Sequence, residues 1–143
     1  MKRFALAFAL LLGLTAAAAA QVINAATTNG SVKITTGLIY QVIQAAVNTS
    51  STSGSVRHSL TIENNNTNGD VCYLFIGGTQ ITAGTTTAST SITVGGVSMT
   101  AAQASILLAG GGGSFARYFP YVPSDAIYGT CASAGDSLYV DTQ

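Results

Sequence analysis

The feature that most constrains the fold is a succession of short apolar segments separated by turn-forming residues. The clearest segment covers residues 56–62. One face of the predicted strand there carries Val56, His58, Leu60 and Ile62, and the other face carries Arg57, Ser59 and Thr61. Alternation with a period of two is typical of a β-strand with one buried face. Repeated about six to eight times, such segments predict an all-β fold, an antiparallel β-sandwich or jelly-roll-like single domain.

Further strands are predicted elsewhere in the chain, at residues 31–35, 38–47, 71–76, 106–108, 115–119, 126–131 and 138–140. Segment 38–47 also has apolar residues at helical spacing, so a helix stays open there although a strand is favoured.

The connections are predicted from turn-forming residues. The Asn-rich segment 63–70 is expected to be a turn that joins its two neighbouring strands into a hairpin. Residues 77–105 are rich in Thr, Ser, Gly and Ala and predict a long excursion with one or two short strands. Loose turns are expected at residues 110–113 and 133–136.

The N-terminus has the three-part plan of a secretory signal peptide. Lys2 and Arg3 precede an apolar run at residues 4–14, and residues 15–20 are small. We therefore expect a signal peptide at 1–20, a polar lead at 21–37 and the sandwich domain at 38–143. No cysteine follows the apolar run, which argues against a lipid anchor, so no stable membrane anchor is expected after cleavage.

The remaining charges are few. Downstream of residue 20, the cations are Lys33, Arg57 and Arg117, and the carboxylates are Glu63, Asp70, Asp125, Asp136 and Asp141. Binding to nucleic acid relies on clustered cations that replace phosphate counterions. Three scattered cations exclude a direct nucleic-acid ligand.

Two cysteines, Cys72 and Cys131, occur in a chain that we expect to be exported. In an oxidising compartment they have only one intramolecular pairing. A structural disulfide is therefore predicted. A catalytic thiol is disfavoured, because there is no C-x-x-C spacing and no basic neighbour to hold a thiolate.

The order of strands and turns resembles that of small β-sandwich structural proteins in the virions of tailed bacteriophages and prophages. The matching pattern consists of Arg57, residues 59–62, the Asn-rich turn, residues 72–77, 105–108, the Gly turn at 110–113, residues 117–118 and residues 122–125. It covers about residues 38–143. The resemblance implies a virion module with protein partners or self-association, while the secretory signal favours a cell-surface or periplasmic role.

The residues that could carry chemistry are better explained by structure. His58 is the only histidine and is expected to be half-buried in a sheet. The turn at 63–70 lacks the ordered carboxylates of a calcium loop. No lysine or helix start follows residues 110–113, so they do not form a phosphate cradle. Each of the five carboxylates lies in or beside a predicted turn, so a glycoside hydrolase is disfavoured. No catalytic residue, metal site or cofactor is predicted.

Five aromatic residues follow one another late in the chain: Phe115, Tyr118, Phe119, Tyr121 and Tyr128. About half of them must face the core. We take Tyr118, Tyr121 and Tyr128 as a candidate contact surface, because exposed tyrosines offer flat, amphipathic area to proteins or sugars. The sequence therefore predicts a non-enzymatic structural or binding module, either a virion decoration or fibre component or a surface adhesion domain. The alternative is a secreted protein that binds or cleaves carbohydrate.

Overall fold

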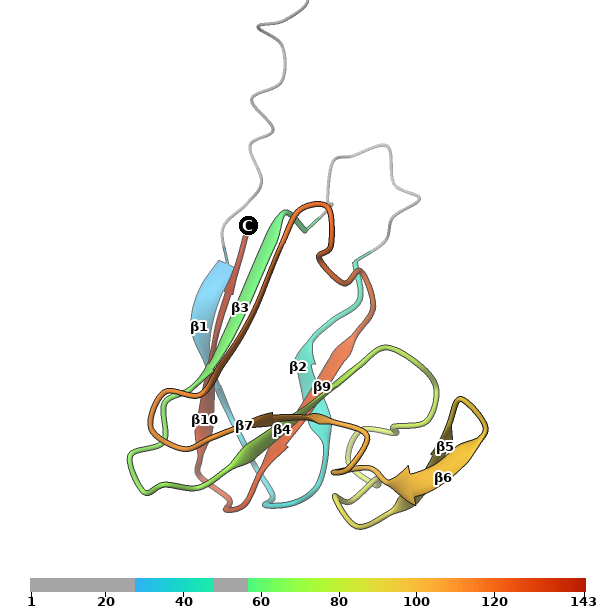
Figure 1. The fold of residues 1–143 in the computed structure, drawn as a ribbon. Helices are drawn as coiled ribbons and strands as arrows, with labels where there is room; N and C mark the ends of the chain where they lie inside the picture. The colour runs from blue at the N-terminus through green and yellow to red at the C-terminus, as the bar shows by residue number, and fades with distance from the viewer. Residues whose placement is uncertain (1–27, 48–56) are drawn as a thin grey trace, which may run out of the picture.

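The computed structural model describes residues 28–47 and 57–143, which form ten β-strands and no helix (Figure 1). The strands are β1 (Thr28–Lys33), β2 (Gln41–Gln44), β3 (Ser59–Asn64), β4 (Cys72–Ile76), β5 (Ser91–Val94), β6 (Val97–Thr100), β7 (Ile106–Leu108), β8 (Ser114–Tyr118), β9 (Ile127–Cys131) and β10 (Ser137–Thr142). The signal peptide predicted at residues 1–20 lies outside the described residues.

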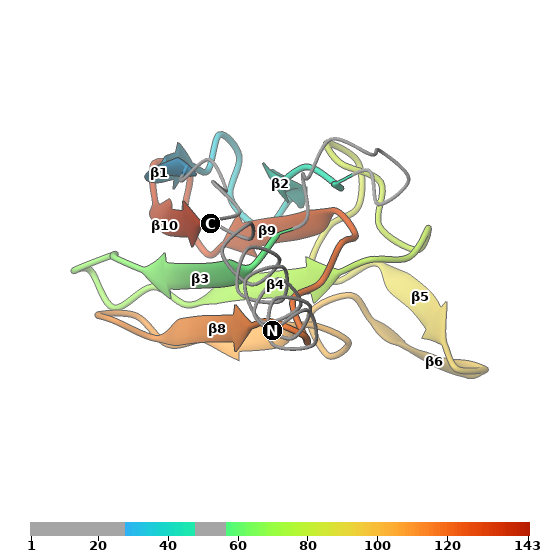
Figure 2. The same ribbon diagram turned by 90° about the horizontal axis from the view of Figure 1, so that it is seen from above.

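Eight of the strands form two four-stranded antiparallel sheets, ordered β1-β10-β3-β8 and β2-β9-β4-β7. The two sheets lie side by side as layers when the molecule is seen from above (Figure 2). The pairs β1·β10, β2·β9, β3·β8, β4·β7 and β5·β6 are nested, as if one long hairpin had been folded over. This is the strand order of a jelly roll, and it confirms the predicted all-β sandwich.

The main core fills the space between the two sheets. Alternate residues of the central strands point into it, among them Leu60 and Ile62 of β3, Leu74 of β4 and Leu138 of β10. Because neighbouring residues of a strand point to opposite faces, the residues of β3 that alternate with Leu60 and Ile62 point outward. These residues are Ser59, Thr61 and Glu63. The residues that face away from the core therefore form the candidate surfaces of the molecule.

Residues 77–105, which we call the arm, leave β4 and return to it at β7. The arm contains the β5·β6 hairpin and lies on the side of sheet β2-β9-β4-β7 away from the other sheet (Figure 2). Its Ile81, Ile92 and Ala101 form a second core with Tyr40 and Phe75. The predicted excursion with one or two short strands thus forms an ordered layer over one sheet.

The hairpin predicted across the Asn-rich turn is wrong, because β3 and β4 belong to different sheets. The turn carries the chain from one sheet to the other. At its start, the fully buried Asn64 donates from Nδ2 to the backbone oxygens of Asp70 (2.8 Å) and Leu108 (3.2 Å). A buried side chain of β3 that bonds to β7 of the other sheet favours a crossing over a tight hairpin.

Two further boundaries differ from the prediction. Strand β1 lies inside the expected polar lead 21–37 and pairs with β10, so the sandwich begins before residue 38. In segment 38–47 only β2 is a strand. Leu38 has a positive φ of 60°, which places it in a turn.

Candidate binding surfaces

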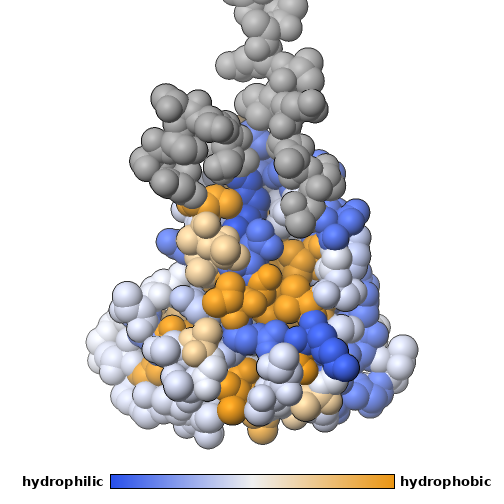
Figure 3. Space-filling model, turned by 180° about the vertical axis from the view of Figure 1, so that it is seen from behind, coloured by the Kyte–Doolittle hydropathy of each residue, from blue (hydrophilic) through white to orange (hydrophobic). Residues whose placement is uncertain are grey.

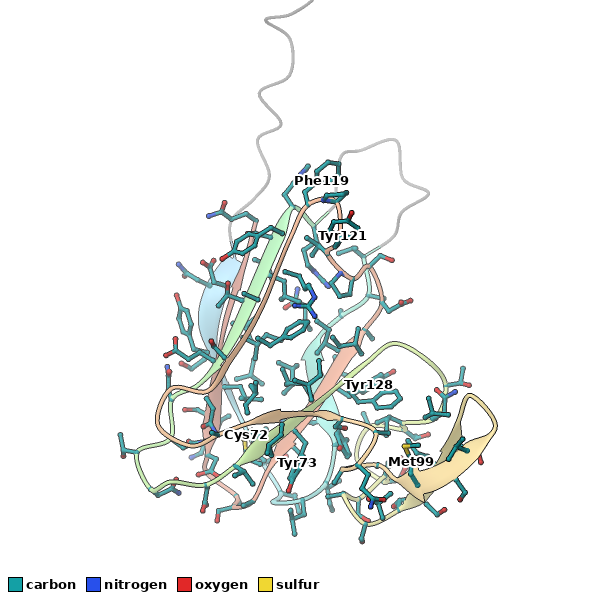
Figure 4. The ribbon with its side chains drawn as sticks, viewed as in Figure 1. Cys72, Tyr73, Met99, Phe119, Tyr121 and Tyr128 are labelled. Carbon is teal, nitrogen blue, oxygen red and sulfur yellow. A yellow bond between two sulfur atoms is a disulfide. The ribbon has the colours of Figure 1, made fainter. Side chains whose placement is uncertain are left out.

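The structure separates the three tyrosines of the predicted contact surface. Tyr118 and Tyr121 are 65 % and 80 % exposed at the end of the sandwich where β8 finishes. Tyr128 is half-buried on β9 and packs against the second core, beneath the arm. Figure 4 shows it well apart from Phe119 and Tyr121. Tyr128 therefore does not share a surface with the other two.

Residues 118–121, which we call the aromatic loop, project three rings, because Phe119 is 67 % exposed as well. The Tyr121 amide donates to the Tyr118 carbonyl at 2.9 Å, closing a turn around the cis peptide bond that precedes Pro120. The Phe119 amide donates to the His58 carbonyl at 2.9 Å, and the His58 and Phe119 rings are 5.8 Å apart. His58 thus supports the aromatic loop.

A buried cation lies close to this loop. Arg57 is nearly inaccessible to solvent, and its two terminal nitrogens donate to the carbonyls of Pro123 (2.5 Å) and Ala45 (2.9 Å). Its Nε has no hydrogen-bond partner. Burial lowers the pKa of this guanidinium from its ordinary value. Arg57 therefore ties together the segments that follow β2 and the aromatic loop.

The outer face of sheet β1-β10-β3-β8, which we call the open face, is polar. In β10, Leu138 and Val140 point into the core, so Tyr139 and Asp141 point outward. The strand register places Tyr139 between Ser31 and Glu63, and Asp141 between Asn29 and Thr61. Tyr118 lies opposite Ser59 at the end nearest the aromatic loop. The open face and the aromatic loop are therefore continuous.

One carboxylate oxygen on the open face is unsatisfied. Asp141 Oδ1 is inaccessible to solvent and has no hydrogen-bond partner. A buried acceptor left unpaired costs about 1–3 kcal/mol relative to one that receives a hydrogen bond.

The opposite outer face, on sheet β2-β9-β4-β7, is apolar and lies under the arm. Tyr73, Phe75 and Tyr128 point away from the main core and contact the second one. Beneath them, Tyr40 is fully buried, and its hydroxyl lies 2.6 Å from Ser105 Oγ. Burial raises the pKa of Tyr40, and the hydrogen bond to Ser105 opposes that shift.

The predicted disulfide joins Cys72 to Cys131 on the inner side of this covered sheet. The two residues lie directly opposite each other on β4 and β9 and are fully buried. The Asn66 side-chain amide lies 3.5 Å and 3.9 Å from their sulfur atoms, and Asn66 Oδ1 accepts from the Ser137 amide at 2.8 Å. The disulfide and the Asn-rich turn form one structural cluster.

The carboxylates considered for catalysis or calcium are dispersed. Asn68 donates from Nδ2 to Asp70 Oδ2 and Asp136 Oδ1, each at 3.0 Å, beside the Asn-rich turn. Glu63 and Asp141 lie on the open face. The Asp125 side chain lies next to Gly77, at the end of β4. Within residues 28–47 and 57–143, no group of three or more His, Cys, Asp or Glu residues could hold a metal ion.

A strip of apolar surface lies between β1 and β2 (Figure 3). These strands are edges of two different sheets, so the core approaches the surface where they adjoin. On these strands, Val42 of β2 is exposed, and Val32 of β1 packs against the main core.

In the part of the chain that the structure describes, no helix is long and apolar enough to span a membrane.

Of the predicted contact residues, Tyr118 and Tyr121 are exposed, whereas the sequence analysis did not single out Tyr139 and Asp141 of the open face. The signal for these two residues was present, because they alternate with Leu138 and Val140 in a predicted strand. The residues around Tyr128 give no sign that the arm covers it, because that covering depends on how residues 77–105 fold back over the sheet.

No protein-family model, curated protein or solved structure matches the chain.

Proposed function

We propose that the protein is an exported, non-enzymatic binding module that attaches to a larger assembly, a virion or a cell surface, through the aromatic loop. One observation carries this proposal. Three aromatic side chains on four successive residues are each at least 65 % exposed. Large exposed aromatic groups are enriched in contact surfaces, where their burial supplies much of the binding free energy.

The loop is built to present these rings. The hydrogen bonds from Phe119 to His58 and from Tyr121 to Tyr118 hold its backbone, so little conformational entropy is lost on binding. The hydrogen bond from Arg57 to the Pro123 carbonyl holds the segment that follows the loop. A loop whose backbone is held in this way suits a contact surface, because its rings are already in place before a partner binds.

Export is supported by two features. The buried Cys72–Cys131 disulfide is compatible with an oxidising environment, and the N-terminal sequence has the plan of a signal peptide. A binding rather than an enzymatic role is supported by the use of the titratable groups. His58 packs on Phe119, and Asp136 accepts hydrogen bonds from Asn68 and the Ser133 amide.

The experiment follows the protein in the cells that produce it. Culture medium, cell envelope and phage-like particles are separated, and each fraction is quantified by mass spectrometry that also reads the mature N-terminus. We expect the wild-type protein, starting near Gln21, in the envelope or the particles. The variant Tyr118→Ser/Tyr121→Ser should move to the medium.

A matched control is Leu107→Ser, which removes an apolar side chain that is 58 % exposed on β7, away from the aromatic loop. This variant should stay with the bound fraction. The proposal fails if the wild-type protein is free in the medium, or if the double variant and the control distribute alike.

A further inference from the structure

Three consecutive asparagines in the turn between β3 and β4 differ sharply in exposure. Asn64 is fully buried and Asn66 is 8 % exposed, whereas Asn65 between them is exposed. The two buried side chains bond to each other, because Asn66 Nδ2 donates to Asn64 Oδ1 at 2.8 Å. The Asn65 side chain makes no hydrogen bond to the residues that the structure describes. This side chain therefore has no part in holding the turn.

The backbone on either side of Asn65 is fixed. The Gly112 amide donates to the Asn64 carbonyl and the Gly111 amide donates to the Asn66 carbonyl, each at 2.9 Å. Both neighbours of Asn65 are thus bonded inward through backbone and side chain. The turn buries two side-chain amides and presents the third one to solvent.

Asn65 also begins an Asn-x-Thr triplet, at residues 65–67, in which Thr67 is exposed as well. This triplet is the acceptor of N-linked glycosylation, which lies in surface loops of exported proteins. Neither of the two buried asparagines has a hydroxyl residue two positions later. Glu63 lies two positions before Asn65, which matches the longer form of the acceptor with a carboxylate there. The exposed asparagine is therefore also the one in the acceptor register.

We propose that Asn65 is a site of N-linked glycosylation. The sugar donor is a lipid-pyrophosphate-linked oligosaccharide, which an oligosaccharyltransferase uses during export. Asn65 Nδ2 forms a bond to C1 of the first sugar as the bond from C1 to the pyrophosphate oxygen breaks. The lipid pyrophosphate leaves, and Nδ2 loses one proton. The inference rests on the export in the proposed function and goes beyond the contact role of the aromatic loop.

Two other triplets of this kind occur in the sequence, at residues 29–31 and 48–50. Residues 29–31 lie on β1, where each residue is paired with one of β10. A triplet inside a paired strand is held along its length, whereas a surface turn is open to an enzyme. The triplet at 48–50 lies outside the described residues. Of the two described triplets, the one at Asn65 is therefore the better acceptor.

A glycan on Asn65 stands away from the aromatic loop. Strand β3 runs from Ser59, which lies opposite Tyr118, to Asn64 at the turn (Figure 1). At the ordinary rise of a strand, the two ends of β3 are about 17 Å apart. The glycan therefore leaves the aromatic loop open to a partner, and modification and attachment can be measured separately.

The test uses full-length protein purified from the fraction of the producing cells in which it accumulates. After reduction and unfolding, trypsin cleaves at the three cations downstream of residue 20 and places each triplet in a separate peptide. The triplet at Asn65 falls in peptide 58–117. We expect mass spectrometry to find this peptide heavier than its sequence by an oligosaccharide. The same peptide at its sequence mass would overturn the inference.

Two variants and a control assign the added mass to Asn65. Asn65→Gln removes the acceptor and Thr67→Ala removes the required hydroxyl, so both should abolish the added mass. The matched control Thr67→Ser keeps a hydroxyl and should retain it. Both side chains are exposed, so the melting temperatures of the unglycosylated variants should agree with each other. Added mass that persists in Asn65→Gln would place the modification on another residue and overturn the inference.

Failure of this inference is distinguishable from failure of the proposed function. If peptide 58–117 has its sequence mass while the N-terminus starts near Gln21 and the protein is attached, only the glycosylation is overturned. If residues 1–20 are still present in the accumulated protein, export is overturned and the glycosylation with it. Tyr118→Ser/Tyr121→Ser should lose attachment and keep the added mass.

Discussion

The two sheets of the sandwich use tyrosine in opposite ways. On sheet β2-β9-β4-β7, Tyr73 and Tyr128 point outward and are packed under the arm as part of a second core. On sheet β1-β10-β3-β8, Tyr139 points outward among polar groups, and Tyr118 is largely exposed. The difference teaches that an outward tyrosine stays exposed only where no other segment of the chain covers it.

We expect the two sheets to contribute unequally to stability for the same reason. The covered sheet is held from inside by the disulfide and from outside by the arm. Surfaces that bind partners rarely contribute much to folding, whereas buried clusters do. Variants in the covered sheet should therefore lower stability and spare attachment, and variants in the aromatic loop, which is continuous with the open face, should do the reverse.

The largest expected effect comes from Cys72→Ala/Cys131→Ala. The disulfide closes a loop of 59 residues, which in the chain-entropy model stabilises the fold by about 4 kcal/mol. Thermal denaturation under non-reducing conditions should show a melting temperature lower by roughly 10–20 °C. An unchanged melting curve would mean that the bond contributes nothing to the covered sheet.

Ile92→Ala should come next. Ile92 is buried in the second core on β5, and truncating a buried isoleucine costs about 2–5 kcal/mol. Val97→Ser, at the exposed end of the same hairpin, is the control and should cost under about 0.5 kcal/mol. Equal losses of unfolding free energy in urea titrations would show that the arm is not anchored through Ile92.

Tyr40→Phe should have a smaller effect, of about 1 kcal/mol, from the lost hydrogen bond to Ser105. Because burial raises the pKa of Tyr40, the folded state favours the neutral phenol. That contribution is fully present below the ordinary tyrosine pKa of 10.0 and is lost as pH rises through the raised value.

Urea titrations between about pH 8 and pH 11 check this dependence of stability on pH. The wild-type protein should lose stability more steeply than Tyr40→Phe in the alkaline part of the range. Parallel curves for the two proteins would contradict the burial of an ionisable phenol under the arm.

The smallest effect on stability is expected for Tyr118→Ser/Tyr121→Ser. Both side chains are mostly exposed, so the free energy of unfolding should change by under about 0.5 kcal/mol. A loss comparable to that of Ile92→Ala would place these rings in the folding core and remove the contrast between the two sheets.

Much of the fold was predictable from local patterns. The alternation around Leu60 and the turn composition at 133–136 follow directly from strand and turn chemistry. The crossing at 63–70 was not predictable in this way. A hairpin turn and a crossing turn share the same Asn-rich composition, and the choice depends on the buried contacts of Asn64 and Asn66 with distant segments.

The candidate site shows the same limit. Exposure of Tyr118 follows from its place at the end of β8, before a proline-containing turn. Burial of Tyr128 depends on an arm that begins more than forty residues earlier in the chain, at Gly77. Long-range packing of this kind leaves no trace in the spacing of a single strand.

The most direct test of the central claim is a binding isotherm of purified protein on the isolated envelope or particle fraction, measured for the wild type and for Tyr118→Ser/Tyr121→Ser. We predict saturable binding by the wild type and at least a roughly 10-fold weaker affinity for the double variant at an unchanged melting temperature. Equal affinities of two equally stable proteins would contradict the assignment of the aromatic loop as the contact surface.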